Sequence, residues 1–108
     1  MSTTVISESS NGSLHPITAQ LVGAASALGG SITVICPGGI GSTDAALISG
    51  VSKVISVEGG CFRTYDCMAW SESLSPLVKG DLILSSSSAI GRELISSIAA
   101  KKGVPVVQ

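Results

Sequence analysis

The chain has 108 residues, and we expect a single domain that spans residues 1–108. Its net charge of −1 creates no field that attracts phosphates, and one Trp, one Tyr and one Phe offer bases little to stack on, so we expect no nucleic-acid binding. Three Cys without a C-x-x-C pair and a single His do not make a metal site, and we expect reduced thiols, no signal peptide and no membrane-spanning segment.

The N-terminal segment predicts a strand, a turn and a helix. The β-branched run of residues 3–7 indicates the first strand. Residues 7–13 are polar and predict a turn. Because proline is favoured in the first turn of a helix, Pro16 predicts a helix that starts at about Leu14 or His15.

The Gly29–Gly30 pair is expected to end this first helix. His15, at its start, is expected to be solvated or to cap the helix rather than to bind a ligand, because no nucleophile is indicated near it. Helical spacing predicts that the buried face is formed by Ile17, Leu21, Ala24, Ala25 and Leu28.

The next segment predicts two strands with a short helix between them. Residues 31–36 and 53–57 have the β propensity of a second and a third strand. The sequence PGGIGS at residues 37–42 lacks the dinucleotide-binding spacing, because Asp44 stands where the last glycine belongs. We interpret it as a turn before a short helix over residues 43–49, with phosphate binding as the weaker alternative.

A short third helix is predicted before the fourth strand. Pro76 interrupts its helical pattern, and we expect the helix to end near Lys79. Its apolar stripe is predicted to contain Cys67, Trp70, Leu74, Leu77 and Val78.

Residues 82–84 are consecutive apolar residues, as in a strand covered on both faces, and predict a central fourth strand. Residues 104–108 predict a fifth strand, whose Pro105 fits a strand start or a sheet edge.

A final helix is predicted between these two strands, with Gly103 at its C-terminal end. Its inner face is expected to contain Ile90, Leu94, Ile95, Ile98 and Ala99. Its solvent face is expected to contain Arg92, Glu93, Ser96, Lys101 and Lys102.

The turn at residues 85–91 is the best candidate for a binding site. Ligands of open parallel sheets meet the carboxyl ends of the strands, where helix N-termini present unpaired N–H groups. Serine hydroxyls beside such groups can bind an anion, and the candidate anion site consists of Ser86, Ser87, Ser88, Gly91 and Arg92. The alternative is that Ser87 or Ser88 only caps the helix.

Strands that alternate with helices predict an α/β fold with an open parallel sheet and helices on both faces. We identify no set of residues for acid–base or nucleophilic catalysis, because each acidic residue is more simply interpreted as solvent-facing or as a helix cap. We therefore expect that the protein is not an enzyme. The acidic residues considered are Asp44, Asp66, Glu72 and Glu93.

Two motifs resemble the N-terminal domain of the electron transfer flavoprotein alpha subunit, and the similarity spans nearly the whole chain. The first is an acidic residue after the first strand, an L-x-P-x-T helix and an A-A-x-x-L-G-G stop, here Glu8, Leu14, Pro16, Thr18, Ala24, Ala25, Leu28, Gly29 and Gly30. The second is a G-R-[DE]-L helix start followed by an A-A pair, here Gly91, Arg92, Glu93, Leu94, Ala99 and Ala100.

This resemblance implies a Rossmann-like sheet of the adenine-nucleotide-hydrolase type that packs against a beta subunit. With the five predicted strands numbered along the chain, the order that it implies within the sheet is 3-2-1-4-5. The resemblance also implies an electron carrier that takes electrons from acyl-CoA-type dehydrogenases. In the family, FAD lies mainly in a separate C-terminal domain of the alpha subunit and AMP in the beta subunit, so we expect no FAD in this segment alone. The location implied is the mitochondrial matrix in a eukaryote and the cytoplasm otherwise.

Two other functions remain open. The fold and the serine turn also suit a small nucleotide- or anion-binding domain, and the apolar composition suits a structural dimerisation module. Because a terminal strand over residues 104–108 leaves an unpaired edge, we expect the isolated chain to form a homodimer.

Overall fold

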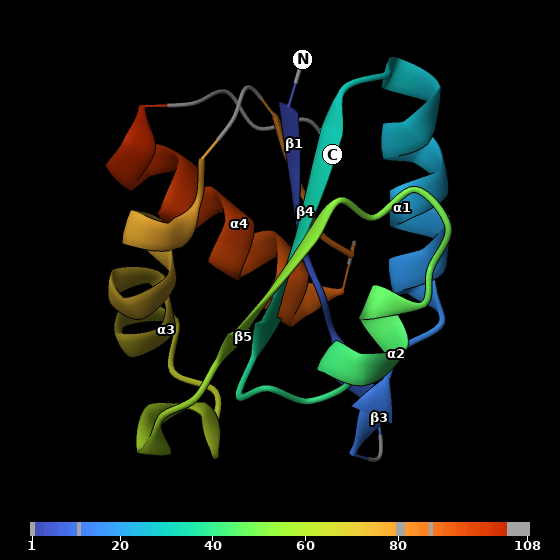
Figure 1. Ribbon diagram of the computed structural model, residues 1–108. Helices are drawn as coiled ribbons and strands as arrows, with labels where there is room; N and C mark the ends of the chain where they lie inside the picture. Colours follow the sequence, from blue (N-terminus) through green and yellow to red (C-terminus); the bar gives the residue numbers. More distant parts are fainter. Residues whose placement is uncertain (1, 11, 80–81, 87, 104–108) are drawn as a thin grey trace.

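Four parallel strands form the centre of the computed structural model, which describes residues 2–10, 12–79, 82–86 and 88–103. Helices cover both faces of this sheet (Figure 1). The strands are β1 (Ser2–Ile6), β2 (Ser9–Ser10), β3 (Ser13–Leu14), β4 (Ser31–Pro37), β5 (Lys53–Val57) and β6 (Leu82–Leu84). The helices are α1 (Ile17–Leu28), α2 (Ser42–Ala46), α3 (Cys67–Leu74) and α4 (Ala89–Lys102), with 3₁₀ turns η1 (Gly60–Phe62) and η2 (Ser75–Leu77).

The strand order is β5-β4-β1-β6, which confirms the α/β class and the order predicted for the first four strands of the chain. The register places Val5 beside both Val34 and Leu84. Residues 104–108 lie outside the described residues. Three points therefore stay predictions: the fifth strand, the central position of β6, which depends on it, and self-association through the fifth strand.

Side chains alternate between two cores because successive residues of a strand point to opposite faces of the sheet. Ile6, Ile35 and Ile83 point to the face covered by α3 and α4, where one buried apolar cluster forms. Val5 and Val34 point to the face covered by α1 and α2, where the second cluster forms (Figure 1). This two-sided burial explains why the strands read as apolar runs.

The turn predicted over residues 7–13 contains a small antiparallel hairpin, in which Ser10 pairs with Ser13 and Ser9 with Leu14. Because Leu14 belongs to β3, the first helix cannot start there, and the predicted start was wrong. Pro16 is the N-cap of α1, and the helix begins at Ile17. His15 caps the helix as expected, since its Nδ1 accepts the Ile17 N–H at 3.0 Å.

The predicted buried face of α1 was partly wrong: Ala25 is buried and Leu21 packs against the core as predicted, but Ala24 and Leu28 do not belong to this face. Thr18, Val22 and Ala25 are buried, whereas Ala24 is exposed and Leu28 is 51% exposed. The sequence of α1 is apolar nearly all round, so helical spacing alone does not determine which face meets the sheet.

The remaining helices lie where the sequence predicts them, but two of them end earlier than predicted. Helix α2 stops at Ala46, three residues before the predicted end. Helix α3 ends at Leu74, five residues before the predicted end near Lys79. The 3₁₀ turn η2 follows from Ser75, because Pro76 lacks the N–H that a longer helix needs. Helix α4 ends at Gly103 with a φ of 69°, as predicted. No helix among residues 2–10, 12–79, 82–86 and 88–103 is long and apolar enough to cross a membrane.

Candidate functional site

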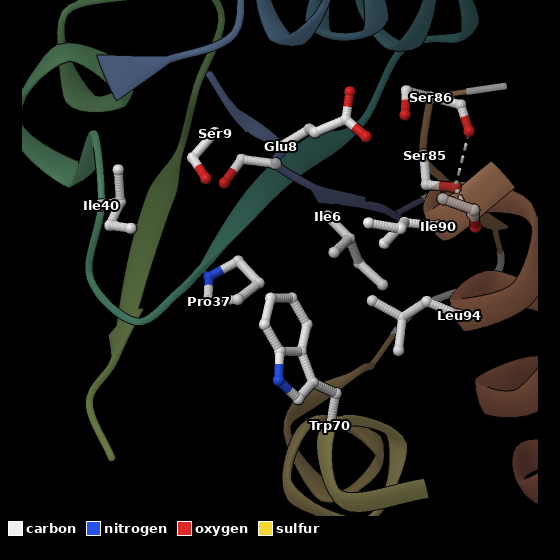
Figure 2. A pocket seen from close by; sticks show the side chains of 12 residues that line it. Ile6, Glu8, Ser9, Pro37, Ile40, Trp70, Ser85, Ser86, Ile90 and Leu94 are labelled. Carbon is white, nitrogen blue, oxygen red and sulfur yellow. Dashed lines mark hydrogen bonds between the residues drawn. The ribbon is translucent and has the colours of Figure 1, made fainter. Parts of the chain in front are cut away.

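A cavity of about 130 Å³ lies at the carboxyl ends of β1 and β4, where α3 and α4 approach the sheet. Figure 2 shows polar side chains on one side of it and the ring of Trp70 with Leu94 on the other. The lining residues are Ile6, Ser7, Glu8, Ser9, Pro37, Ile40, Trp70, Ser85, Ser86, Ile90, Gly91 and Leu94. The cavity thus has an apolar floor and a polar rim.

The polar rim continues into the N-terminus of α4. Ser88 is the N-cap, and its Oγ accepts the Gly91 N–H at 3.0 Å. The same hydroxyl donates to Glu8 Oε1 at 2.5 Å. Its single proton is then used, so Ser86 Oγ, at 3.0 Å, is the donor in the contact between the two hydroxyls. A carboxylate at the end of β1 therefore meets the positive end of α4 through one serine.

Gly91 allows the serine turn to lie directly against α4. A Cβ at this position would lie 2.3 Å from the Ser86 carbonyl oxygen, so no side chain fits there. Ser85 Oγ also donates to the Gly91 carbonyl at 3.0 Å. Both backbone groups of Gly91 are thus held by serine side chains.

The candidate anion residues are only partly brought together. Ser86, Ser88 and Gly91 form one cluster, whereas the Arg92 side chain is exposed and Ser87 lies outside the described residues. The Ser88 cap confirms one of the two capping alternatives. Glu8 adds a carboxylate to the same cluster, and this charge weighs against a bound anion. The anion site stays a prediction.

The PGGIGS segment contributes Pro37 and Ile40 to the cavity wall. Gly41 has a φ of 76°, and a Cβ there would lie 2.6 Å from the Leu14 Cβ. The turn conformation and this close packing account for the glycine, in agreement with our interpretation of the segment as a turn.

Trp70 is held against the cavity by hydrogen bonds and aromatic contacts. Its Nε1 donates to the Cys61 carbonyl at 2.8 Å. Phe62 and Tyr65 meet the indole edge-to-face, with ring centroids 5.2 and 5.1 Å away. The Tyr65 hydroxyl donates to Glu93 Oε1 at 2.6 Å. Burial and this hydrogen bond raise the pKa of the Tyr65 phenol above its ordinary value.

The cysteines form no metal centre. Cys36 is buried, Cys61 is exposed and Cys67 is intermediate, and all three are free thiols. Burial raises the pKa of Cys36, against a smaller opposing effect of its hydrogen bond with Ser7. No cluster of three metal-ligating side chains occurs in the part of the chain that the structure describes.

Sequence reasoning from the residues missed the roles of Glu8 and Trp70 in this cavity. Glu8 follows the first strand directly, and an acidic residue at a strand's carboxyl end could have drawn attention to it. The sequence places Trp70 only in a helix stripe, because no local pattern shows that α3 lies opposite the end of β1.

One comparison with known protein families bears on this site. The family model described as "Electron transfer flavoprotein domain" matches residues 3–108. The match covers the described sheet from Thr3 onward, helices α1 to α4 and every residue named above as lining the cavity.

Proposed function

The chain belongs to the electron transfer flavoprotein domain family, and on this basis we propose that it is the N-terminal domain of an alpha subunit. The observation that carries the proposal is the family match over residues 3–108. The L-x-P-x-T and G-R-E-L motifs, at Leu14 to Thr18 and Gly91 to Leu94, support the choice of subunit. The domain then serves electron transfer as a scaffold that binds a partner.

The proposed partner is a beta subunit of related fold. Together the two subunits pass electrons from acyl-CoA-type dehydrogenases to an acceptor, in the mitochondrial matrix of a eukaryote or in the cytoplasm otherwise. Three large apolar side chains are exposed, Leu47 at 79%, Met68 at 70% and Leu28 at 51%. They lie on or next to helices of both layers, so they do not form one patch and do not identify the partner surface.

FAD does not fit the cavity of this chain. The cavity measures about 130 Å³, whereas pockets for drug-sized ligands measure about 300–1,000 Å³. A second hollow, of about 310 Å³, is an open depression beside η1 and the start of α3. We therefore propose that FAD is held by a separate C-terminal domain, and we assign it no residue here.

No chemical step is assigned to the residues of this domain. The serine side chains at the cavity and its rim already form hydrogen bonds within the protein: Ser88 Oγ donates to Glu8 Oε1, and Ser85 Oγ donates to the Gly91 carbonyl. Among the described residues we find no serine or cysteine paired with a histidine base, the arrangement that nucleophilic catalysis requires. The proposed role is to orient the partner and the flavin-bearing domain.

Purification from the native source tests this proposal. The chain is purified through an affinity tag, and native mass and flavin absorbance are measured on the same species. An unrelated protein that carries the same tag is the control. We expect a complex that contains this chain, a second subunit and about one flavin. A pure species that lacks both the flavin and a second subunit would contradict the proposal.

A further inference from the structure

The cavity has a one-sided charge. Glu8 is at its rim, half-buried, and no Lys, Arg or His occurs among the described residues that line it. The described lining therefore contains one carboxylate and no cationic side chain, and Glu8 is balanced only in part, by the N-terminus of α4 that it meets through Ser88. This favours a positively charged ligand by Coulomb attraction.

The donors that would bind an anion are already used. The Gly91 N–H is directed to Ser88 Oγ, and the Ser88 proton is directed to Glu8. Glu8 thus occupies, through Ser88, the role at the N-terminus of α4 that a bound anion would take.

The opposite wall is suited to an apolar body. Ile6 and Leu94 are aliphatic, and the ring of Trp70 lies beside them in Figure 2. The cavity of about 130 Å³ is close to the roughly 150 Å³ that holds a benzene ring. The occupant is therefore small.

We propose that this cavity binds a small primary amine with an apolar body, whose ammonium group is held by the Glu8 carboxylate and whose carbon atoms pack against Trp70 and Leu94. An ammonium group carries three donors, and the lining offers carboxylate and serine oxygens as acceptors. The proposed amine binding requires neither flavin nor a partner subunit, so its test is independent of the test of the proposed electron-transfer role.

The test uses isobutylammonium as the probe, isobutanol as its uncharged analogue and inorganic phosphate as the anion. Trp70 is the only Trp of the chain, so intrinsic fluorescence reports directly on the cavity wall. With about five non-hydrogen atoms, isobutylammonium is expected to bind in the millimolar range. We expect isobutanol to bind about tenfold more weakly, because it lacks the charge that Glu8 recognises, and phosphate to have no effect.

Two variants and a matched control assign the site. Glu8→Gln retains an acceptor for Ser88 and is expected to weaken isobutylammonium about tenfold. Glu72→Gln makes the same change at an exposed position of α3 outside the cavity and should bind like the parent. Ile90→Phe fills the cavity from a side chain that is 44% exposed, and it should abolish binding while the protein stays folded.

Amide chemical shifts of Glu8, Ser86 and Gly91 provide a second readout that does not rely on fluorescence. Binding that moves these amides and depends on Glu8 supports the proposal. The proposal is overturned if phosphate binds as well as isobutylammonium, if Glu8→Gln leaves the amine affinity unchanged, or if the amine fails to bind at its highest soluble concentration.

Discussion

The three cysteines of the chain differ in how far solvent reaches their sulfur atoms. Cys36 is fully buried and its pKa is raised by burial, whereas Cys61 is exposed. The thiolate is the reactive form, so both effects protect Cys36. We predict that an aromatic disulfide reagent modifies Cys61 first and Cys36 last, at the rate at which the protein unfolds.

Peptide mass spectrometry over the time course identifies the modified residue. In denaturant the three thiols should react at similar rates, which serves as the control. Equal and rapid modification of Cys36 and Cys61 in native buffer would contradict the predicted burial.

Tyr65 links protein stability to alkaline pH. Its folded-state pKa is raised above the unfolded value of about 10, so the folded state holds the phenol proton more tightly. The resulting stability is fully present below pH of about 10 and is lost as pH rises through the folded-state pKa. We predict that the parent loses stability above pH of about 10 and that Tyr65→Phe loses less.

Urea unfolding followed by far-ultraviolet circular dichroism at several pH values measures this difference. Because Tyr65 is the only Tyr, phenolate absorbance titrates it alone in the parent. A parent and a Tyr65→Phe variant with parallel stability profiles would show that the phenol has no raised pKa.

At the scale of elements, two helical glycines have opposite surroundings. Gly91, near the start of α4, lies so close to Ser86 that a Cβ would be 2.3 Å from its carbonyl oxygen. Gly23, within α1, faces open space, because a Cβ added there would meet no atom within 4 Å. Gly91→Ala should therefore destabilise by about 1–3 kcal/mol, since the turn must move. Gly23→Ala should stabilise by roughly 0.5–1 kcal/mol.

The free energy of unfolding in urea measures both substitutions at neutral pH. The pair is its own control, because both changes add one methyl group to a helix. If Gly91→Ala were as stable as the parent, the close contact between the serine turn and α4 would be refuted.

The inner strands were predictable from sequence because their burial on both faces produces apolar β-branched runs, as in residues 32–36 of β4. The bounds predicted for residues 53–57 also agree with those observed, although β5 is only partly buried. The buried face of α1 was not predictable from sequence, because neighbouring residues on different faces are all apolar and only tertiary contacts select among them. These residues are Leu21, Val22, Ala24 and Ala25. The hairpin of β2 and β3 was missed, although the Asn11-Gly12 dipeptide is a hairpin signal.

The candidate site was predictable only in its local part. The Ser88 cap could be inferred from one turn of sequence, since a cap contacts residues within the same turn. The contact between Ser88 and Glu8 joins residues 80 positions apart, and it arises because β1 and β6 are neighbours in the sheet. Such a contact can be predicted only after the order of the strands in the sheet is known.

At the scale of the whole molecule, the cavity size predicts how the isolated domain behaves. A chain purified without partners should carry no flavin, because a cavity of about 130 Å³ cannot enclose the isoalloxazine ring system with its nucleotide tail. Visible absorbance after desalting measures this, with and without added FAD during refolding. Stoichiometric flavin on the desalted chain would contradict the prediction.

The distribution of aromatic residues makes the two layers of the molecule optically unequal. Phe62 and Tyr65 both contact Trp70 on the face covered by α3 and α4, and the chain has no other aromatic residue of these three types. Near-ultraviolet dichroism and excitation transfer from Tyr65 to Trp70 therefore observe that layer alone. Loosening of α1 and α2 is invisible to them, so a partly melted protein would look native to an aromatic probe while its amide signal had already fallen.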